Sequence, residues 1–284
     1  MYKKSAKTLA GHGIGNLYLI KSINNFIISH LKSNLTYVQG HKMYLDSSYS
    51  LEFSIDGIWE PLETDLVKKE IKKGDIVLDI GANIGYYTLI FAKLVGKEGK
   101  VYAFEPDPNT FALLKKNIEM NRYGNVVLEQ KAVSNKTGKI KLYLSSYSVD
   151  NRTYDSGDGR KYIEVESMRL DDYFKNDDEK ISVVKMDIQG AEGIAIEGMP
   201  MLLEKNEKLK IITEFWPLGL QRCGTEPRNF SKLLEKYGFK LYNINEQEKK
   251  IKLITTDALS KTYTPEKDNY TNLLCVRDNS ATVE

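Results

Sequence analysis

The chain has 284 residues, of which 41% are hydrophobic and 28% charged, and its formal net charge at pH 7 is +2. These values are typical of a globular protein with a sizeable core, and the near-zero charge argues against a general nucleic-acid-binding protein. The two cysteines, Cys223 and Cys275, match no metal or redox spacing, and no signal peptide or membrane span is apparent, so we expect reduced thiols and a cytoplasmic protein.

Residues 1–56 are predicted to form an N-terminal extension. Apolar residues at helical spacing predict a helix over 15–32, and two short strands are expected over 44–51 and 51–55. The first 45 residues contain six lysines, all three histidines and no acid. This segment is either a basic face for a membrane surface or an acidic glycan, or a solvated helix packed on the next domain; we favour the helix.

From residue 57 to 284 the pattern predicts one α/β domain. A helix over 60–72 precedes strands at 76–80, 100–104 and 126–129, and a second helix covers 109–121. Further strands are expected at 181–186, 209–214, 239–244 and 272–276, the last two forming an antiparallel hairpin at the sheet edge. The prediction is therefore a seven-stranded, mostly parallel sheet with helices.

An insertion over about 139–168 interrupts this alternation. Its ends, 139–144 and 162–168, alternate like two antiparallel strands, and the polar segment 145–161 joins them. A loop of this length in a compact domain is usually functional or disordered. Because it follows the strand that ends at 129, on the side where ligands bind, it is either a lid over the substrate or a plain surface loop.

The segment VLDIGANIG, residues 77–85, reads as a strand, a tight turn and the start of a helix. About twenty residues later the next strand ends at Glu105, where an acid can accept both hydroxyls of a ribose. A dinucleotide site needs G-x-G-x-x-G, but Asn83 and Tyr86 occupy the second and third glycine positions and would crowd a pyrophosphate. The pattern favours S-adenosylmethionine (SAM) over NAD, so an NAD-dependent oxidoreductase is the weaker alternative.

Two motifs carry a family resemblance: VLDIGANIGYYT at 77–88 and VKMDIQGAE at 184–192. Together with GIWEPLET (57–64), QKAVSN (130–135) and RLDDYF (169–174), they resemble the FkbM-type methyltransferases. One departure is Gln189, where the family usually has Glu. The resemblance implies a class I methyltransferase fold with a Rossmann-like sheet, helices on both faces, and SAM-dependent methylation. The usual acceptor is a hydroxyl of a sugar, a glycolipid or polysaccharide, or a secondary metabolite.

The expected cofactor residues fall into groups along the SAM molecule. We expect its methionine end at the glycine turn, its ribose at Glu105, and its adenine against the backbone after the third strand. Two residues just before the first strand are expected to close over it. The predicted set is Asp79, Gly81, Asn83 and Gly85; Glu105, Pro106 and Asp107; Ala132 and Val133; and Glu60 and Thr64.

Asp187, at the end of a predicted strand, is the best candidate for accepting or orienting the acceptor's hydroxyl proton; the alternative is a structural cap of the helix near Ala191. Glu192 either contacts substrate or favours the helix N-terminus. Glu214 either lines the acceptor pocket or binds Mg²⁺ together with Asp187; we do not favour the metal. Lys185 is expected to be an ion-pair partner.

The expected partners are SAM and a small-molecule or glycan acceptor, without nucleic acid. A SAM-fold protein that binds without catalysis remains the alternative from another class.

Overall fold

The computed structural model describes residues 35–46, 57–146 and 148–277, and its contacts divide the chain into two units, Met1–Trp59 and Glu60–Glu284. In the first unit, β1 (Leu35–Val38) and β2 (His41–Tyr44) form an antiparallel hairpin. Its two turn residues, Gln39 and Gly40, both have positive φ, as a type I′ turn requires. This first strand was not predicted. The expected helix over 15–32, and all but 44–46 of the two expected strands, lie outside the described residues.

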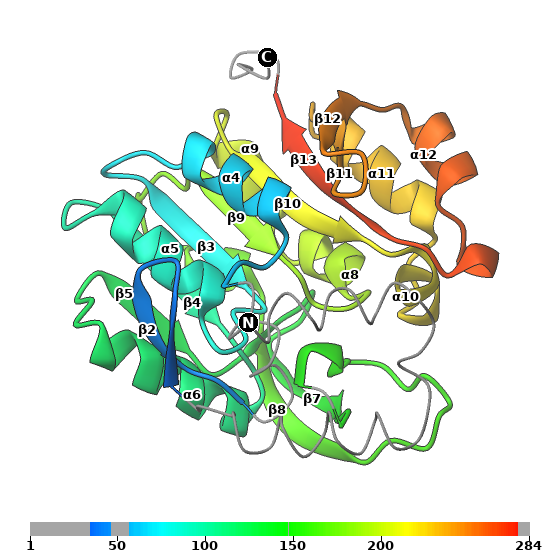
Figure 1. Ribbon diagram of the computed structural model, residues 1–284. Coiled ribbons are helices and arrows are strands. Elements are labelled where there is room, and N and C mark those ends of the chain that lie inside the picture. Colours follow the sequence, from blue (N-terminus) through cyan, green and yellow to red (C-terminus); the bar gives the residue numbers. More distant parts are fainter. Residues whose placement is uncertain (1–34, 47–56, 147, 278–284) are drawn as a thin grey trace, which may run out of the picture. The chain divides into compact units, whose positions relative to one another are not determined.

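The second unit is built on an eight-stranded sheet in the order β12-β11-β13-β10-β9-β3-β4-β5 (Figure 1). Five neighbouring strands of this sheet, β10, β9, β3, β4 and β5, are parallel. In contrast, β13 runs antiparallel to both of its neighbours, β10 and β11. The strands are β3 (Ile76–Ile80), β4 (Lys100–Phe104), β5 (Val126–Glu129), β9 (Val183–Met186), β10 (Lys210–Phe215), β11 (Lys240–Asn245), β12 (Lys250–Leu253) and β13 (Thr271–Val276).

All seven predicted strands are present within two residues at each end, and the antiparallel pairing of the last two is confirmed. The prediction that this pair forms the sheet edge is wrong, because an eighth strand, β12, lies outside β11. Three of the four β12 residues are exposed and the fourth is half-buried. The sequence of β12, Lys-Ile-Lys-Leu, does alternate, but a run of four residues is at the lower limit for a strand prediction, and it was not recognised.

Alternation along β3 divides its side chains between the two faces of the sheet. Leu78 and Ile80 join the main hydrophobic core, which the helices α8 (Glu192–Glu197), α9 (Pro200–Lys205) and α11 (Pro227–Lys236) cover. Val77 and Asp79 point to the opposite face. There α5 (Tyr86–Val95) packs on β3 and β4, next to α4 (Pro61–Glu70), as Figure 1 shows.

The remaining helices connect these layers. The predicted helices at 60–72 and 109–121 are observed as α4 and as α6 (Pro108–Met120). The others are α7 (Leu170–Tyr173), α10 (Pro217–Arg222) and α12 (Thr256–Thr262), with short 3₁₀ turns at η2 (Ser148–Asp150) and η3 (Pro265–Lys267). No helix among the described residues has both the length and the apolar character needed to span a bilayer.

A small second sheet forms the insertion. The strands β7 (Gly138–Tyr143) and β8 (Tyr162–Met168) pair antiparallel, which confirms the predicted pair, and β6 (Ala132–Val133) runs parallel to β8. We call the connection between β7 and β8 the 145–161 loop. Arg152, in the middle of this loop, forms a β-bridge with Tyr143 at the end of β7, so the loop folds back on that strand. The guanidinium of Arg152 also forms an ion pair with Asp150.

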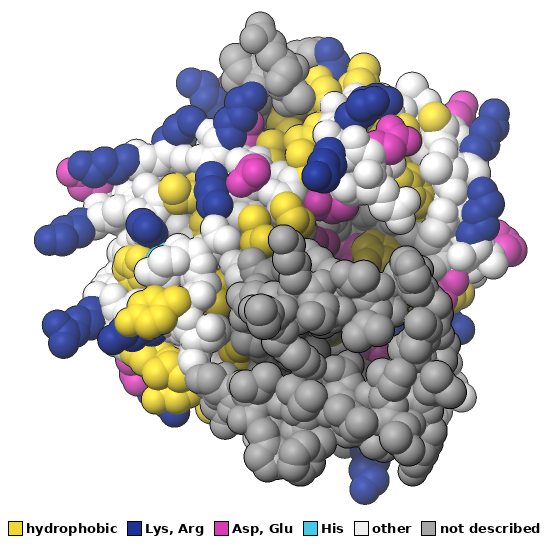
Figure 2. All heavy atoms as spheres, viewed as in Figure 1, with side chains coloured by type: hydrophobic (Ala, Val, Ile, Leu, Met, Phe, Trp, Pro, Cys, Tyr) yellow, Lys and Arg dark blue, Asp and Glu magenta, His cyan; other side chains and the backbone are white. Residues whose placement is uncertain are grey.

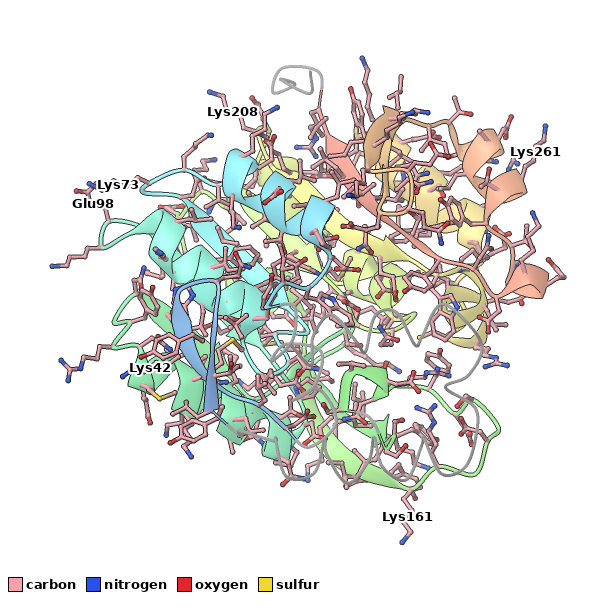
Figure 3. All side chains as sticks on the ribbon, in the orientation of Figure 1. Lys42, Lys73, Glu98, Lys161, Lys208 and Lys261 are labelled. Atoms are coloured by element: carbon pink, nitrogen blue, oxygen red, sulfur yellow. The ribbon has the colours of Figure 1, made fainter. Side chains whose placement is uncertain are left out.

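Most charged side chains of the described residues are on the surface. In the view of Figure 2, Lys and Arg side chains are scattered rather than gathered in one patch. Lys73 and Glu98, labelled in Figure 3, form an exposed ion pair with 3.8 Å between Nζ and Oε1. Lys208 and Lys261 also project outward in that view. The buried charges described below are therefore exceptional for this molecule.

Candidate active site

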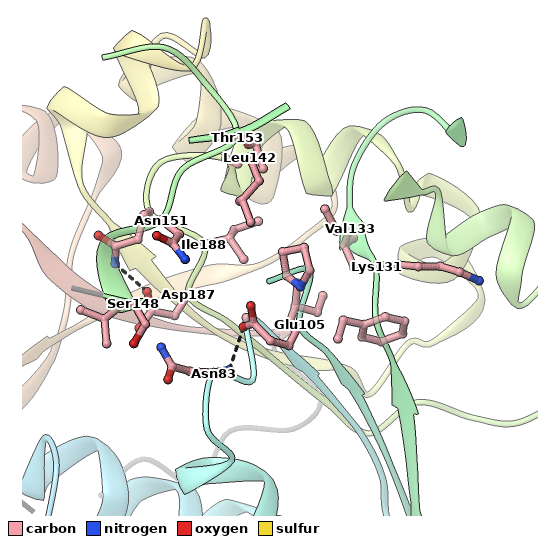
Figure 4. Close-up of a pocket in the computed structure, with 18 residues that line it drawn as sticks. Asn83, Glu105, Lys131, Val133, Leu142, Ser148, Asn151, Thr153, Asp187 and Ile188 are labelled. Atoms are coloured by element: carbon pink, nitrogen blue, oxygen red, sulfur yellow. Dashed lines mark hydrogen bonds between the residues drawn. The ribbon is translucent and has the colours of Figure 1, made fainter. Parts of the chain in front are cut away.

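A pocket opens at the carboxyl ends of the parallel strands, and it encloses about 550 Å³ of space, including space open to solvent (Figure 4). This is the edge at which ligands bind in open α/β sheets. Its walls come from the turn after β3, the end of β4, the small sheet, the 145–161 loop and the segment after β9. The lining includes seven predicted residues: Gly81, Asn83, Glu105, Pro106, Ala132, Val133 and Asp187.

The turn after β3 takes its shape from close backbone contacts. Gly81 has a φ of +83°, and a Cβ on it would lie 2.0 Å from the carbonyl oxygen of Asp187. Asn83 also has a positive φ, which its side chain tolerates, and its Oδ1 accepts a hydrogen bond from Ile84 N–H at 2.7 Å. Gly85, at φ +95°, precedes α5, and a Cβ on it would lie 2.8 Å from Cδ1 of Leu114. The result is a narrow turn that leaves the pocket open above it.

Glu105 is held as an acceptor in the pocket wall. Its two oxygens accept hydrogen bonds from the backbone N–H groups of Asn83, at 3.0 Å, and Asp107, at 2.9 Å (Figure 4 marks the first). Burial raises the pKa of Glu105 to about 8, although both N–H groups favour the charged form. A fixed carboxyl group here can accept hydrogen bonds from the hydroxyls of a ribose, which is the role predicted for it.

Asp107 borders this wall without lining the pocket. Its Oδ1 caps α6 by accepting from Asn109 N–H at 2.7 Å, and its Oδ2 accepts from the side chain of Asn151 at 2.8 Å. Asn151 does line the pocket, together with Leu142, Ser148, Val149 and Thr153 of the insertion. The 145–161 loop is thus part of the pocket wall, facing the strand ends (Figure 4).

Asp187 follows β9 directly and faces the pocket. Its N–H donates to the carbonyl of Ile80 at 3.0 Å, and its Oδ1 accepts from the side-chain amide of Gln189 at 3.0 Å. Its Oδ2 is 3.6 Å from Lys185 Nζ. Asp187 does not cap α8, because Ala191 stands at the N-cap and no side chain caps that helix end. Gln189, the departure from the family pattern, can donate this hydrogen bond, which an ionised glutamate could not.

A buried ion pair lies beneath Asp187. Lys185 is 3% exposed, and its Nζ is 3.4 Å from Oε1 of Glu63, which is fully buried on α4. The same Nζ is 4.8 Å from the centre of the Tyr87 ring. Burial lowers the pKa of Lys185, but the charges of Glu63 and Asp187 outweigh it and leave the pKa raised. Lys185 is therefore a buried cation between two acids, which confirms its prediction as an ion-pair partner.

Several predicted residues lie outside the pocket lining. Asp79 is buried on β3 and accepts a hydrogen bond from the Thr88 hydroxyl at 2.5 Å, and burial raises its pKa to about 6. Thr64 is buried between α4 and α5, where its hydroxyl is 3.0 Å from that of Tyr86. The Oε1 of Glu192 accepts from Ile188 N–H at 2.9 Å, and burial raises the pKa of Glu192 to about 7.

Glu60 and Glu214 lie together on the far side of Asp187. Glu60 precedes α4 and accepts hydrogen bonds from the side chain of Asn272 at 2.8 Å and the hydroxyl of Tyr87 at 3.3 Å. Burial and the charge of Glu63 raise the pKa of Glu60 to about 8. Burial, followed by the charges of Asp187 and Glu192, raises the pKa of Glu214 well above its usual range.

Sequence reasoning did not single out Asn272, Asn151 or Glu63. Asn272 is in a strand otherwise rich in apolar residues, and Glu63 belongs to the GIWEPLET segment without a signal of its own. Of the two aromatic residues after Glu214, Phe215 is fully buried in the core, and Trp216 donates to Asp268 at 2.8 Å. Among the described residues, no group of three or more His, Cys, Asp and Glu side chains could hold a metal ion.

The family model described as the methyltransferase FkbM domain matches residues 79–241, more than half of the chain. The chain is 26% identical to the hexuronic acid methyltransferase AglP of Haloferax volcanii over 71% of this chain and 84% of that protein. It is 31% identical to the 2-O-methyltransferase NoeI of Sinorhizobium fredii over 53% and 70%, respectively. Among solved structures, it resembles a SAM-dependent O-methyltransferase from Thermotoga maritima with a TM-score of 0.44 and 12% identity, covering 92% of this chain and 82% of that one.

The strand order, the pocket at the carboxyl ends of the strands and the matching family model agree. The chain belongs to the FkbM methyltransferase domain family and is a SAM-dependent methyltransferase.

Proposed function

We propose that the protein methylates a hydroxyl group of a sugar or of a sugar-bearing molecule. The observation that carries this proposal is the position of Asp187, whose carboxylate lines the pocket that Glu105 and Gly81 also line. The names of two relatives support the acceptor class, since AglP is a hexuronic acid methyltransferase and NoeI a 2-O-methyltransferase.

The pocket residues fit SAM. Gly81 leaves the turn free of a side chain, and Glu105 presents a fixed acceptor at the end of β4, where a ribose would bind. When bound, SAM supplies an electrophilic methyl group on its sulfonium. The predicted roles of the remaining residues, including Asp79 near the amino group and Pro106 beside the adenosine, stay part of this proposal.

Asp187 has two properties that suit a hydroxyl acceptor. Its Oδ1 is oriented by Gln189, and its Oδ2 faces Lys185, so the carboxylate is held in one position. A carboxylate at this place can accept the hydroxyl proton while the oxygen attacks the methyl carbon and the carbon–sulfur bond breaks. The attacking oxygen becomes the ether oxygen of the product, and the proton remains on Asp187 until it passes to water.

The test measures transfer of a labelled methyl group from SAM to a panel of sugars by wild-type protein and by Asp187→Asn. We expect the substitution to lower kcat by about 10²–10⁴-fold, the range for loss of general-base catalysis, while the Kd for S-adenosylhomocysteine (SAH) changes little. The control, Asp172→Asn, alters an exposed aspartate that bonds Thr137 and should leave kcat unchanged.

Two outcomes would contradict the proposal. An Asp187→Asn protein with wild-type kcat would remove Asp187 from the reaction. SAH binding without turnover on any acceptor would favour the non-catalytic alternative. Adding EDTA to the wild-type assay tests the metal alternative, because loss of activity that Mg²⁺ restores would show metal dependence and favour Asp187 and Glu214 as ligands.

A further inference from the structure

The carboxylate of Asp187 depends on a small number of contacts for its orientation. Its side chain is 34% exposed, and it lines the pocket. Among the described residues, two groups reach its oxygens. Lys185 Nζ is 3.6 Å from Oδ2, which is longer than a normal hydrogen bond, whereas Gln189 Nε2 donates to Oδ1 at 3.0 Å. Gln189 is therefore the residue that fixes the direction of this carboxylate.

The backbone brings Gln189 back to Asp187 through a tight turn after β9. Gln189 has a φ of +55°, in the left-handed region that long side chains seldom adopt, and Gly190 follows at φ +100°. The turn closes where Ala191 N–H donates to the carbonyl of Ile188 at 3.4 Å. A left-handed conformation at a residue such as glutamine persists only where the surrounding structure imposes it.

Three neighbouring elements impose this turn. The carbonyl oxygen at its start would lie 2.0 Å from a Cβ on Gly81, directly after β3. On the side of α10, a Cβ on Gly190 would lie 2.4 Å from the carbonyl carbon of Gly219. From the first turn of α8, Glu192 accepts a hydrogen bond from Ile188 N–H at 2.9 Å. The backbone that carries Gln189 is thus held by β3, α8 and α10.

An amide at position 189 can donate to Asp187 at any pH, whereas a carboxyl group there could not. An ionised glutamate has no proton to donate, and a protonated one would share its proton with Asp187. Burial raises the pKa of Glu60 to about 8 and that of Glu192 to about 7, so acids near Asp187 already titrate around neutral pH. The titratable groups that act on Asp187 or line its pocket are Lys185, Asp79, Glu60, Glu63, Glu192, Glu214, Glu105 and Lys131.

Resting on the proposed function, we infer that Gln189 is a positioning residue for methyl transfer, and that its amide keeps Asp187 in the proton-accepting orientation independently of pH. Gln189 holds Oδ1 of Asp187, which leaves Oδ2 to accept the hydroxyl proton. The position at which this chain departs from the family pattern therefore sets the pH range over which Asp187 can act.

The test uses the full chain in the labelled-methyl assay, with the sugar of the panel that the wild-type protein methylates fastest. Gln189→Met keeps the length of the side chain and removes the donor. We expect its kcat to fall about tenfold or more, the effect of losing a hydrogen bond to a charged group, while the KM of the sugar and the Kd for SAH change little. The matched controls, Gln221→Met and Gln221→Glu, alter an exposed residue of α10 outside the pocket lining and should behave as wild-type protein.

Gln189→Glu supplies a readout that a merely structural role would not change. At low pH the new carboxyl group is protonated and can donate to Asp187, because two carboxylates that share a site retain one proton to a higher pH than either alone. At high pH both are ionised, and the donor is lost. We expect the ratio of the variant kcat to the wild-type kcat to fall about tenfold from about pH 5 to about pH 9. The ratio removes the titration of the other acids, which both proteins contain.

The outcomes separate this inference from the proposed function. If both variants keep the wild-type kcat, or the ratio for Gln189→Glu stays level or rises with pH, Gln189 does not position Asp187, while methylation of sugars stands. If both variants lose SAH binding, Gln189 serves the fold or the cofactor instead of the transfer, and the inference is wrong. If wild-type protein binds SAH in the calorimeter but methylates no sugar of the panel, the proposed function falls, and this inference falls with it.

Discussion

The side-chain amide of Asn151 donates a hydrogen bond to Oδ2 of Asp107 over 2.8 Å, and this contact joins the 145–161 loop to the N-terminus of α6. The next residue, Arg152, places its guanidinium 4.7 Å from the centre of the Trp216 ring, beyond the end of β10. Two adjacent loop residues thus contact opposite sides of the site. We interpret the loop as a cover over the cofactor, whereas the sequence had left open a lid over the substrate or a plain surface loop.

Replacing Asn151 with Asp should weaken cofactor binding. The new carboxylate would face Asp107 and repel it, so we expect the loop to open and the Kd for SAH to rise about five- to tenfold, by calorimetry. Asn135→Asp is the matched control, because Asn135 donates to Glu197 at 2.9 Å in an exposed hydrogen bond and is not part of the pocket lining. Equal Kd values for the two variants would show that the loop does not retain the cofactor.

Removing the charge of Glu105 should weaken SAM and SAH binding by about 10- to 100-fold at pH 9, where this carboxyl group is ionised, since hydrogen bonds to a charged group contribute about 1.5–3 kcal/mol. The variant Glu105→Gln keeps the size of the side chain and loses the carboxylate. Glu129→Gln is the control: Glu129 ends the neighbouring strand β5 and bonds the hydroxyl of Tyr173 at 3.0 Å, outside the pocket lining. Similar titration curves for Glu105→Gln and wild-type protein would rule out the ribose role.

The affinity for SAH should rise with pH through about 8. In the free protein, burial raises the pKa of Glu105 from 4.5 to about 8, so this group is largely neutral at pH 7 and ionised at pH 9. Ribose hydroxyls donate best to the ionised form, so we expect up to about tenfold tighter binding at pH 9 than at pH 7. Other acids of the site titrate nearby, and Glu105→Gln isolates this contribution, because its pH dependence should be flatter. If the Kd for SAH changed with pH equally in wild-type protein and in Glu105→Gln, a group other than Glu105 would cause the effect.

The central strands could be predicted because β3, β4, β9, β10 and β13 are buried on both faces and are short, mostly apolar runs, two of which are followed directly by Glu105 and Asp187. The positions of Gly81 and Glu105 in the pocket wall could also be predicted, since they follow from local chain geometry. On the side of Asp187, the sequence also indicated Glu214 but not Asn272. Asn272 is 85 residues beyond Asp187, and only the insertion of β13 between β10 and β11 brings it beside Glu214. No local pattern encodes such a pairing.

The assignment of Glu60 shows the same limit. Its segment, GIWEPLET, could be recognised as important, and it was expected to close over the cofactor. In the structure Glu60 accepts a hydrogen bond from Asn272 and lies outside the pocket lining, because α4 packs beside α5 and near β11. Its role at the cofactor stays a prediction. The sequence indicated that the segment around Glu60 is functional. It could not indicate Asn272 as the partner of Glu60, because this contact depends on where α4 packs against the sheet.

Substituting Gly81 with Ala should destabilise the fold and abolish SAH binding. The added Cβ would lie 2.0 Å from the Asp187 carbonyl oxygen, at a φ that alanine rarely adopts. We expect a loss of about 2–4 kcal/mol in the free energy of unfolding, measured with urea. Gly124→Ala serves as the control, because nothing lies within 4 Å of its Cβ position. A Gly81→Ala protein as stable as the control would mean that the turn can move away from Asp187.

The buried ion pair predicts a non-additive result. Lys185→Met leaves Glu63 and Asp187 without their cation and should cost about 3–5 kcal/mol of stability. Adding Glu63→Gln should recover about 1 kcal/mol or more, because one uncompensated charge is removed. The exposed counterpart Lys73→Met, which breaks the pair with Glu98, should change stability by less than about 0.5 kcal/mol. If the changes in the free energy of unfolding for Lys185→Met and Glu63→Gln simply add, the two side chains do not interact.

The order of the site residues along the chain has an evolutionary consequence. Glu214 and Asn272, which pair beyond Asp187, come late in the chain, whereas the turn after β3 and Glu105 line the pocket and come early. We therefore expect mutations in the last third of the chain to alter which molecule is methylated while the methyl donor still binds. A chimera that keeps residues up to about Gly198 and takes the rest from another family member should retain the donor and inherit the new acceptor, so the fold allows its chemistry to diversify one half at a time.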